Sequence, residues 1–430
     1  MIRIVLLIAI VIWAAACKTG PGLFGKQSAH EKYASKIKSA GLAETALGRQ
    51  WLAEAGKAIE QPVKISIPYK EMGYFPADKP RAVGLRFTAK RGQKIMFDLE
   101  KNPATNFLLF ADLWQAEEKP SLLLSADSTQ NNFEFVVDED GDYLLRLQPE
   151  LLKSGDYTIS ISIGPSLASP VAGNKGRVAS VWGDARDAGV RQHEGIDLFA
   201  PFRTPVVAAA DGIVTRVNEN NLGGRVVWLR PKGRNLSLYY AHLDEQLVTA
   251  GKSVKAGDTL GLIGNTGNAR TTPPHLHFGI YAVGGAINPL PFVDQVIKEP
   301  SSFSASRNDF EKYLKLTREE KLPAEENPVI LQRNTIVEPV AITADQYRIV
   351  LPDGGVVFVS KKKTAVLNES LKNSRLEAAA HLYDKPALSA AKIIAVEKDT
   401  PVKVYGYFEE FAFVELNETK GWIPDSLLHK

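Results

Sequence analysis

The chain has 430 residues, of which 44% are hydrophobic and 23% are charged. These values are those of an ordinary globular protein, and the length predicts several domains. The net charge of +3 is too small to indicate a nucleic-acid partner. The single cysteine, Cys17, excludes an intrachain disulfide and a zinc cluster of thiolates.

The N-terminus is typical of an export signal. Arg3 provides a charged start, Ile4–Trp13 is apolar, and three alanines directly precede Cys17. The apolar run is too short to span a bilayer, which needs roughly 20 residues, but it suits a cleaved signal peptide. Small residues before a cysteine resemble the lipobox of bacterial lipoproteins, although Ala14 stands in place of the usual leucine.

We therefore expect residues 1–17 to be a lipoprotein signal peptide. The mature protein would be exported and held at a bacterial membrane by a lipid on Cys17, facing the periplasm or the cell envelope. A plain signal peptide with an incidental cysteine is the alternative.

Residues 18–61 are expected to form a tether followed by a helical segment. Helix-favouring residues fall into two pieces, Glu31–Ser39 and Leu42–Glu60, which Gly41 separates. Nothing in these pieces indicates chemistry, so a pair of packing helices is the preferred interpretation.

Between residues 62 and 165 the pattern changes to short strands separated by turns. The alternation of apolar and polar residues at this spacing predicts an antiparallel β-sandwich. The clearest strands are Val63–Ile67, Lys94–Asp98, Asn132–Val136 and Tyr157–Ile161. Asp140–Arg146 and Gly155–Ser160 resemble the small β-sandwich modules that accompany secreted bacterial peptidases.

A linker at residues 166–175 leads into a domain at 176–297 that carries most of the histidines. The charged segment that follows, at 298–327, has a composition that predicts a helical linker.

Two segments near the C-terminus share one pattern. Leu351–Phe358 and Leu416–Ile423 each combine a strand, a polar turn that ends in glycine, and an apolar pair. The second resembles the end of bacterial Src-homology-3-like barrels, so we expect such barrels at 328–366 and 375–430. They could contact the cell wall or another protein, or cover the neighbouring domain as a lid. The expected fold is therefore mainly β, with short N-terminal helices, an antiparallel sandwich and small C-terminal barrels.

Four of the seven histidines lie between residues 193 and 277, and two of them form the pattern His275-Leu276-His277-Phe278. Two prolines before His275 favour an extended start. In a strand, residues two apart share one face, with Cα atoms roughly 6.6 Å apart. Both imidazoles would then enter one cleft while Leu276 and Phe278 pack in the core. One imidazole can hold a metal and the other can stand beside its bound water; two solvent-facing histidines are the structural alternative.

His193 and Asp197 need a bend between them. In an extended strand their side chains would lie roughly 13 Å apart, whereas zinc ligands sit only about 2.0–2.2 Å from the ion. Gly195 permits such a bend. Two prolines shortly after Asp197 favour a loop that leads into a strand over a helix.

His242 ends the predicted strand Leu236–Leu243, where it shares a face with Tyr240. That position can carry the imidazole to the edge of a cleft. A lone histidine is more often structural, so only the other two segments make a functional role the better interpretation. Tyr240 is interpreted as a packing residue.

Taken together, these segments resemble the lysostaphin-type zinc metallopeptidases, which cut the peptide part of peptidoglycan. The order and spacing of every motif agree over roughly 120 residues. The matching motifs are Ser180–Gly183, Arg186, His193–Asp197, Ala208–Gly212, Tyr240–Leu243, Lys255–Asp258, Gly264–Gly267 and His275–Phe278. Asn265 and Arg270–Thr272 replace commoner residues in the loop before His275.

The resemblance implies an antiparallel β fold with a groove and one zinc ion per chain. His193, Asp197 and His277 correspond to the zinc ligands, and His242 and His275 correspond to the non-ligand catalytic histidines. Two neutral imidazoles and one carboxylate leave the zinc positively charged with an open position, which lowers the pKa of a bound water to near 7.

The expected function is thus that of a zinc metalloendopeptidase that hydrolyses peptide cross-links of peptidoglycan and takes its stem peptides as substrate. His242 and His275 would orient the water, stabilise the oxyanion and pass a proton to the leaving amine. One alternative is a non-catalytic, wall-binding activator of another cell-wall hydrolase; another is a metal-storage or sensor module. The presence of all five site residues favours the enzyme.

Overall fold

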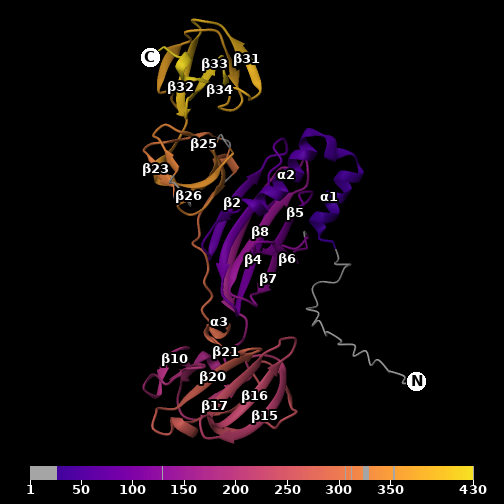
Figure 1. The fold of residues 1–430 in the computed structure, drawn as a ribbon, viewed down its shortest axis with the longest axis vertical. Helices are drawn as coiled ribbons and strands as arrows, with labels where there is room; N and C mark the ends of the chain where they lie inside the picture. The colour runs from indigo at the N-terminus through magenta and orange to yellow at the C-terminus, as the bar shows by residue number, and fades with distance from the viewer. Residues whose placement is uncertain are drawn as a thin grey trace, which may run out of the picture.

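The structure is a computed structural model that describes residues 27–127, 129–305, 307–310, 312–322, 329–351 and 354–429. It is built mainly from antiparallel strands, as expected (Figure 1). The predicted signal peptide and Cys17 lie outside the described residues. Within the described ranges, no helix is both long enough and apolar enough to cross a bilayer.

The N-terminal helices are present close to where the sequence predicts them. Helix α1 spans Ala29–Ser39 and α2 spans Ala46–Glu60, with a 3-10 turn at Leu42–Glu44 between them. Ser28 begins α1 with a capping box that includes Glu31. The helices pack against the sandwich that follows, where the Trp51 indole donates to the Pro149 carbonyl over 2.8 Å.

The predicted sandwich consists of two sheets that enclose one apolar core. The first sheet has the strand order β1-β3-β8-β5-β6, and β2-β9-β4-β7 belong to the second. Only β1 and β3 pair in parallel within these nine strands. The bounds are β1 Val63–Lys64, β2 Tyr69–Phe75, β3 Val83–Ala89, β4 Gln93–Asn102, β5 Leu109–Gln115, β6 Ser121–Ser125, β7 Asn132–Val136, β8 Gly141–Pro149 and β9 Gly155–Pro165.

The second sheet continues into residues from the other end of the chain. Strand β2 pairs with β25 through Met72 opposite Ile342 and Gly73 opposite Ala341, and β26 and β27 extend the sheet further. The bounds are β22 Leu314–Leu316, β23 Glu320–Leu322, β24 Val329–Leu331, β25 Ile336–Ile342, β26 Gln346–Val350, β27 Val356–Ser360 and β28 Thr364–Val366. The strands predicted for a barrel at 328–366 therefore have an apolar core that is distinct from that of the sandwich, but they are joined to it. They share a sheet with the sandwich and also take in β22, which precedes that range.

The prediction of a helical linker at 298–327 is wrong. Its described residues contain one 3-10 turn, Arg307–Asp309, and the short strands β22 and β23. Leu314, Leu316 and Leu322 are buried, with polar residues between them. The two-residue spacing of Leu314 and Leu316 indicates a strand. The prediction missed it because it was based on the many charged residues of this segment.

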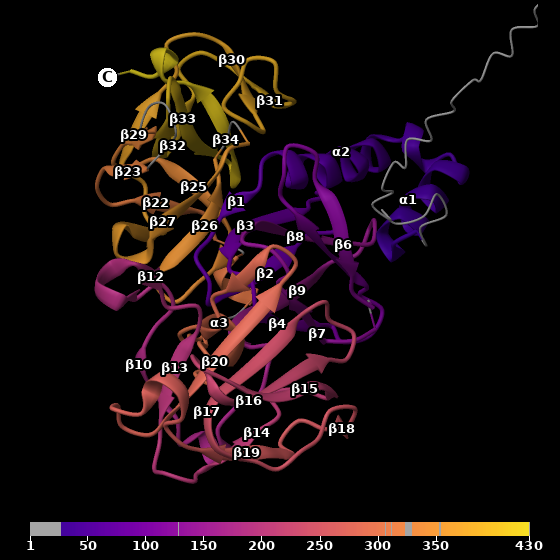
Figure 2. The same cartoon turned by 60° about the horizontal axis from the view of Figure 1, so that its bottom comes forward.

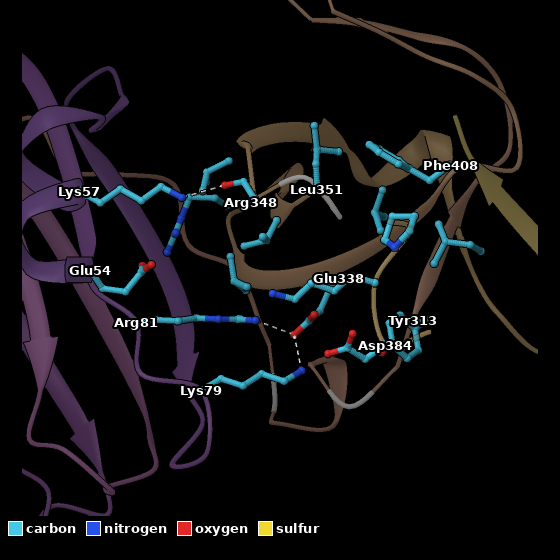
Figure 3. A pocket seen from close by; sticks show the side chains of 18 of the residues that line it. Glu54, Lys57, Lys79, Arg81, Tyr313, Glu338, Arg348, Leu351, Asp384 and Phe408 are labelled. Atoms are coloured by element: carbon cyan, nitrogen blue, oxygen red, sulfur yellow. Dashed lines mark hydrogen bonds and ion pairs between the residues drawn. The ribbon is translucent and has the colours of Figure 1, made fainter. Parts of the chain in front are cut away.

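Residues 372–424 form a six-stranded sheet with the order β29-β32-β33-β34-β30-β31 and a small core of its own. The bounds are β29 Lys372–Arg375, β30 Ala380–Tyr383, β31 Lys392–Val396, β32 Pro401–Phe408, β33 Phe411–Leu416 and β34 Thr419–Pro424. A cleft of about 860 Å³ lies between this unit, α2, the sandwich and the strands β25–β27. Figure 3 shows Lys79 and Arg81 facing Glu338 across this cleft.

The remaining domain is inserted between these two halves. The chain enters it after β9 and leaves it beside the entry point, where Ile163 and Lys298 exchange backbone hydrogen bonds of 3.0 and 2.8 Å. Its main sheet has the order β10-β13-β20-β17-β16-β15-β18, and Figure 2 shows most of these strands side by side. The bounds are β10 Arg177–Ser180, β11 Ala185–Arg186, β12 Arg191–Gln192, β13 Ile196–Phe199, β14 Pro205–Val207, β15 Gly212–Asn220, β16 Gly224–Pro231, β17 Ser237–Gln246, β18 Ser253–Val254, β19 Thr259–Ile263, β20 His275–Ala282, β21 Gly285–Ile287 and the helix α3 Leu290–Val293.

Candidate metal centre

Three neighbouring strands of the inserted domain position the site. Strand β20 lies between β13 and β17, and His277 is opposite Asp197 on one side and Ala241 on the other. Residues opposite each other in antiparallel strands have Cβ atoms about 4.5–5.5 Å apart. Segments that are far apart in sequence thus meet on one face of the sheet.

Strand β20 has the alternation that its sequence predicts. Leu276 and Phe278 are fully buried in the core of the domain. His275 and His277 lie on the opposite face, where the His275 ring stacks on Phe199 with centroids 4.8 Å apart. Both imidazoles therefore enter the same site.

The chain bends between His193 and Asp197, as the sequence analysis predicts for two ligands of one ion. Strand β12 ends at Gln192 and β13 begins at Ile196, and the bend brings His193 Nε2 within 3.0 Å of Asp197 Oδ1. Gly195 has a further role that the sequence did not indicate. A Cβ atom at this position would lie 2.6 Å from Cε1 of His277, so only glycine leaves room for that ring.

Three potential ligand atoms converge on one point. His277 Nδ1 lies 2.9 Å from His193 Nε2 and 3.1 Å from Asp197 Oδ1, and the group meets the geometry of a metal site. Around a tetrahedral zinc with bonds near 2.1 Å, neighbouring ligand atoms are roughly 3.4 Å apart. The observed spacing needs only a small expansion to accept the ion.

The protonation of these groups also favours a cation. His193 Nδ1 lies 2.9 Å from the Val181 carbonyl, which can only accept, so this nitrogen carries the proton and Nε2 keeps its lone pair. The Arg186 guanidinium lies 2.9 Å from Asp197 Oδ2, and this opposite charge favours the ionised carboxylate. The ionised carboxylate of Asp197 and the lone pair on His193 Nε2 thus point at each other and repel. A cation bound between them would remove this repulsion.

Arg186 fixes the carboxylate of Asp197. Its guanidinium donates to Oδ2 over 2.9 Å, so Oδ1 is the oxygen that faces the two imidazoles and can bind a metal ion. The same nitrogen donates to Ser180 Oγ over 2.5 Å. Arg186 belongs to one of the sequence motifs, but its role could not be predicted because a contact between β11 and β13 is not visible in a linear pattern.

His242 and His275 lie beside this trio without belonging to it. Their ring centroids are 5.0 Å apart, and His275 Nε2 is 3.9 Å from Asp197 Oδ1. Each Nδ1 donates to a backbone carbonyl over 2.9 Å, from His242 to Thr266 and from His275 to Pro273. In its neutral form, each ring therefore keeps its lone pair on Nε2.

Burial lowers the pKa of His242 to about 4, and the charges of His277 and His275 add to this effect. Burial also lowers the pKa of His277. Both rings are consequently neutral at pH 7. Neutral imidazole is the form that ligates a metal or accepts a proton.

Tyr240 is fully buried, and its hydroxyl accepts a hydrogen bond from the Ala209 amide over 3.0 Å. This is the packing role expected from the sequence. The other three described histidines lie elsewhere: His30 stacks on Trp51, the His381 ring is 6.4 Å from the Tyr383 ring, and His429 lies 3.6 Å from Glu377.

Comparisons with known proteins find similarity in the domain that contains this site. Residues 191–289 match the model of Peptidase family M23. A protein of Haemophilus influenzae named as an uncharacterized metalloprotease is 45% identical over 102 residues, which are 24% of this chain and 21% of that protein. The peptidoglycan DD-endopeptidase ShyA of Vibrio cholerae is 30% identical over 182 residues, 41% of this chain and 38% of its own.

Among solved structures, the catalytic domain of the antimicrobial peptidase lysostaphin from Staphylococcus simulans is 30% identical. The match covers 28% of this chain and 94% of that domain, with a TM-score of 0.26. The chain spans less than half the length of the two curated relatives above.

The matched region includes His193, Asp197, His242, His275 and His277, the five residues that the strands bring together. Residues 191–289 of the inserted domain therefore form a domain of peptidase family M23.

Proposed function

We propose that the protein is a zinc-dependent endopeptidase that hydrolyses peptide cross-links of peptidoglycan. The observation that carries this proposal is the convergence of His193, Asp197 and His277 at 2.9–3.1 Å, with two further buried imidazoles beside them. The family match and the named activity of ShyA support the choice of substrate.

His193, Asp197 and His277 would hold the ion, through Nε2, Oδ1 and Nδ1 respectively. When bound, zinc supplies a Lewis acid for the scissile carbonyl and lowers the pKa of a coordinated water to near 7. An ion held by three protein ligands keeps one position open for that water.

The chain's own residues would handle the protons. In their neutral forms His242 and His275 have their lone pairs on Nε2, so either can accept a proton from the attacking water and return it to the amine nitrogen as the C–N bond breaks. Arg186 keeps Asp197 in place throughout. Hydrolysis of the peptide bond consumes one water and yields one carboxylate and one amine.

The test uses the purified full chain with defined sacculi and with cross-linked muropeptides. The expected result is about one zinc per chain and new amine and carboxylate ends, identified by mass spectrometry. A chelator should stop cleavage and added zinc should restore it, whereas His193→Ala should not respond to zinc. Bound metal without any cleavage by the natural sequence would contradict the proposal and would favour the wall-binding activator.

Export, lipid attachment and wall contact are further proposals, and they are supported by sequence patterns. We propose that Cys17 carries the lipid and that the β units near the C-terminus contact the wall or a protein partner. Metabolic labelling with a fatty-acid analogue should mark the natural chain but not Cys17→Ser. An unlabelled natural chain in the soluble fraction of the envelope would refute the anchor.

A further inference from the structure

His242 has a backbone conformation that needs support. Its φ is 62°, in the left-handed region that side chains other than glycine rarely adopt. Its amide donates to the Gly223 carbonyl over 2.7 Å, and its side chain is buried between β17 and the loop after β19. A proton-transferring imidazole in this position must be held by its surroundings.

Thr266 contacts His242 and both of the strands beside it. Its carbonyl accepts from His242 Nδ1 over 2.9 Å. Its hydroxyl donates to the Leu243 carbonyl over 2.8 Å and accepts from the Arg225 amide over 3.0 Å. One threonine thus links the loop after β19 with the end of β17 and the start of β16.

Two glycines bring these loops into direct contact. A Cβ atom on Gly224 would lie 2.2 Å from Thr266 Oγ1, and a Cβ atom on Gly267 would lie 2.4 Å from the Leu222 carbonyl oxygen. Both glycines have positive φ, 62° and 71°. The hydroxyl of Thr266 is therefore confined between the two loops. Moving either loop away would break the hydrogen bonds of this hydroxyl to Leu243 and Arg225.

We propose that Thr266 is a positioning residue that sets the orientation and the tautomer of His242, an inference that rests on the function proposed above. The Thr266 carbonyl can only accept, so it selects the ring form with the proton on Nδ1 and the lone pair on Nε2. The Thr266 hydroxyl fixes where that carbonyl lies. The hydrogen bonds of Thr266 join it to His242, Leu243 and Arg225, so the proposed role is separate from metal binding.

The test compares Thr266→Val with Thr266→Ser in the full chain. Valine keeps the shape and removes both hydroxyl hydrogen bonds, whereas serine keeps the hydroxyl. Thr266→Val should lower kcat on a muropeptide by on the order of 10- to 100-fold with little change in KM, because a small displacement of a catalytic group has such an effect. Zinc affinity should be unchanged, and Thr266→Ser should restore kcat to near the natural value.

A second measurement does not depend on turnover. In the zinc-free protein, the nitrogen-15 shifts of the His242 ring should show one tautomer in the natural chain and in Thr266→Ser, and a mixture in Thr266→Val. If Thr266→Val does not fold, Thr266→Ala removes the same hydrogen bonds without adding a methyl group. In a His242→Ala background, Thr266→Val should cause no further loss of kcat.

An unchanged tautomer together with unchanged kcat in the folded variant would overturn the inference. So would an equal loss of kcat from Thr266→Val in the presence and absence of His242. If the natural chain cleaves nothing, the proposed function fails, but the ring tautomer still decides whether Thr266 positions His242.

Discussion

The inserted peptidase domain and the body around it are assembled in opposite ways. Every strand of the peptidase sheet comes from Arg177–Ile287, so its site is complete within one continuous segment. The nine-stranded sheet instead joins β2 to β25, from before and after the insertion. Figure 1 shows this composite body and the peptidase domain as separate lobes.

This difference predicts which substitutions would damage each part. The peptidase site depends on side chains that gather around one point. The composite body depends on a buried polar cluster at its junction, where the Arg348 guanidinium contacts both Glu71 oxygens at 3.1 and 3.0 Å. The Tyr69 and Tyr157 hydroxyls each donate to Glu71 over 2.6 Å. Damage to one part should leave the other intact.

The largest effect is expected from Asp197→Ala. Loss of this carboxylate removes one of the three proposed ligands, and the several kcal/mol that a bound metal contributes to catalysis correspond to a loss of activity on the order of 1000-fold or more. Zinc titration and muropeptide cleavage measure both effects. Asp258→Ala, at an exposed turn of the same domain, serves as the control and should retain metal and activity. Natural zinc affinity in Asp197→Ala would refute the ligand assignment.

Glu71→Ala should destabilise the composite body and spare the metal site. It leaves the buried Arg348 without its carboxylate, which typically costs about 3–5 kcal/mol of unfolding free energy. Urea unfolding gives the stability, and zinc titration should show the natural affinity. Glu338→Ala breaks a more exposed pair with Arg81 at the same junction and should cost about 0–1 kcal/mol. Equal losses from both variants would contradict the role of burial.

His30 should make the stability of the composite body depend on pH. Burial, followed by the charge of Arg146, lowers the pKa of His30 from its usual 6.5 to about 4. Between these values the unfolded chain binds a proton that the folded chain does not. Stability is therefore full above pH 6.5 and falls as the pH drops toward 4, by at most about 3 kcal/mol.

Comparing the natural chain with His30→Gln isolates this effect. The difference in unfolding free energy between the two proteins should change between pH 7.5 and 4.5. A constant difference would show that His30 titrates normally. The nuclear magnetic resonance shift of the ring provides a direct reading of its pKa.

The smallest effect is expected from Arg186→Met. The variant removes the hydrogen bond to Asp197 Oδ2 but keeps all three ligands. Loss of such a partner typically weakens metal affinity by about 10- to 100-fold. Competition with a chromogenic chelator measures the change, and Arg186→Lys should recover part of it. An unaltered affinity in Arg186→Met would leave the arginine with a packing role only.

Parts of the molecule could be read from sequence because their signals are local. His275 and His277 alternate with Leu276 and Phe278, and the structure has the predicted two-residue period. The helices α1 and α2 follow from their composition and from the break at Gly41. The prediction of a helix at 298–327 is wrong because it relied on the charged composition and not on the two-residue spacing of Leu314 and Leu316.

The sequence by itself determined the residue types of each segment and the spacing of its apolar residues. From these we could predict the strand that carries His275 and His277, the bend at Gly195 and the family resemblance. Only the tertiary structure decided which segments meet: Arg186 on Asp197, Thr266 on His242, and β25 on β2 across the inserted domain. Periodicity is a property of neighbouring residues, whereas strand pairing depends on the packing energy of residues far apart in the chain. No linear pattern carries that information.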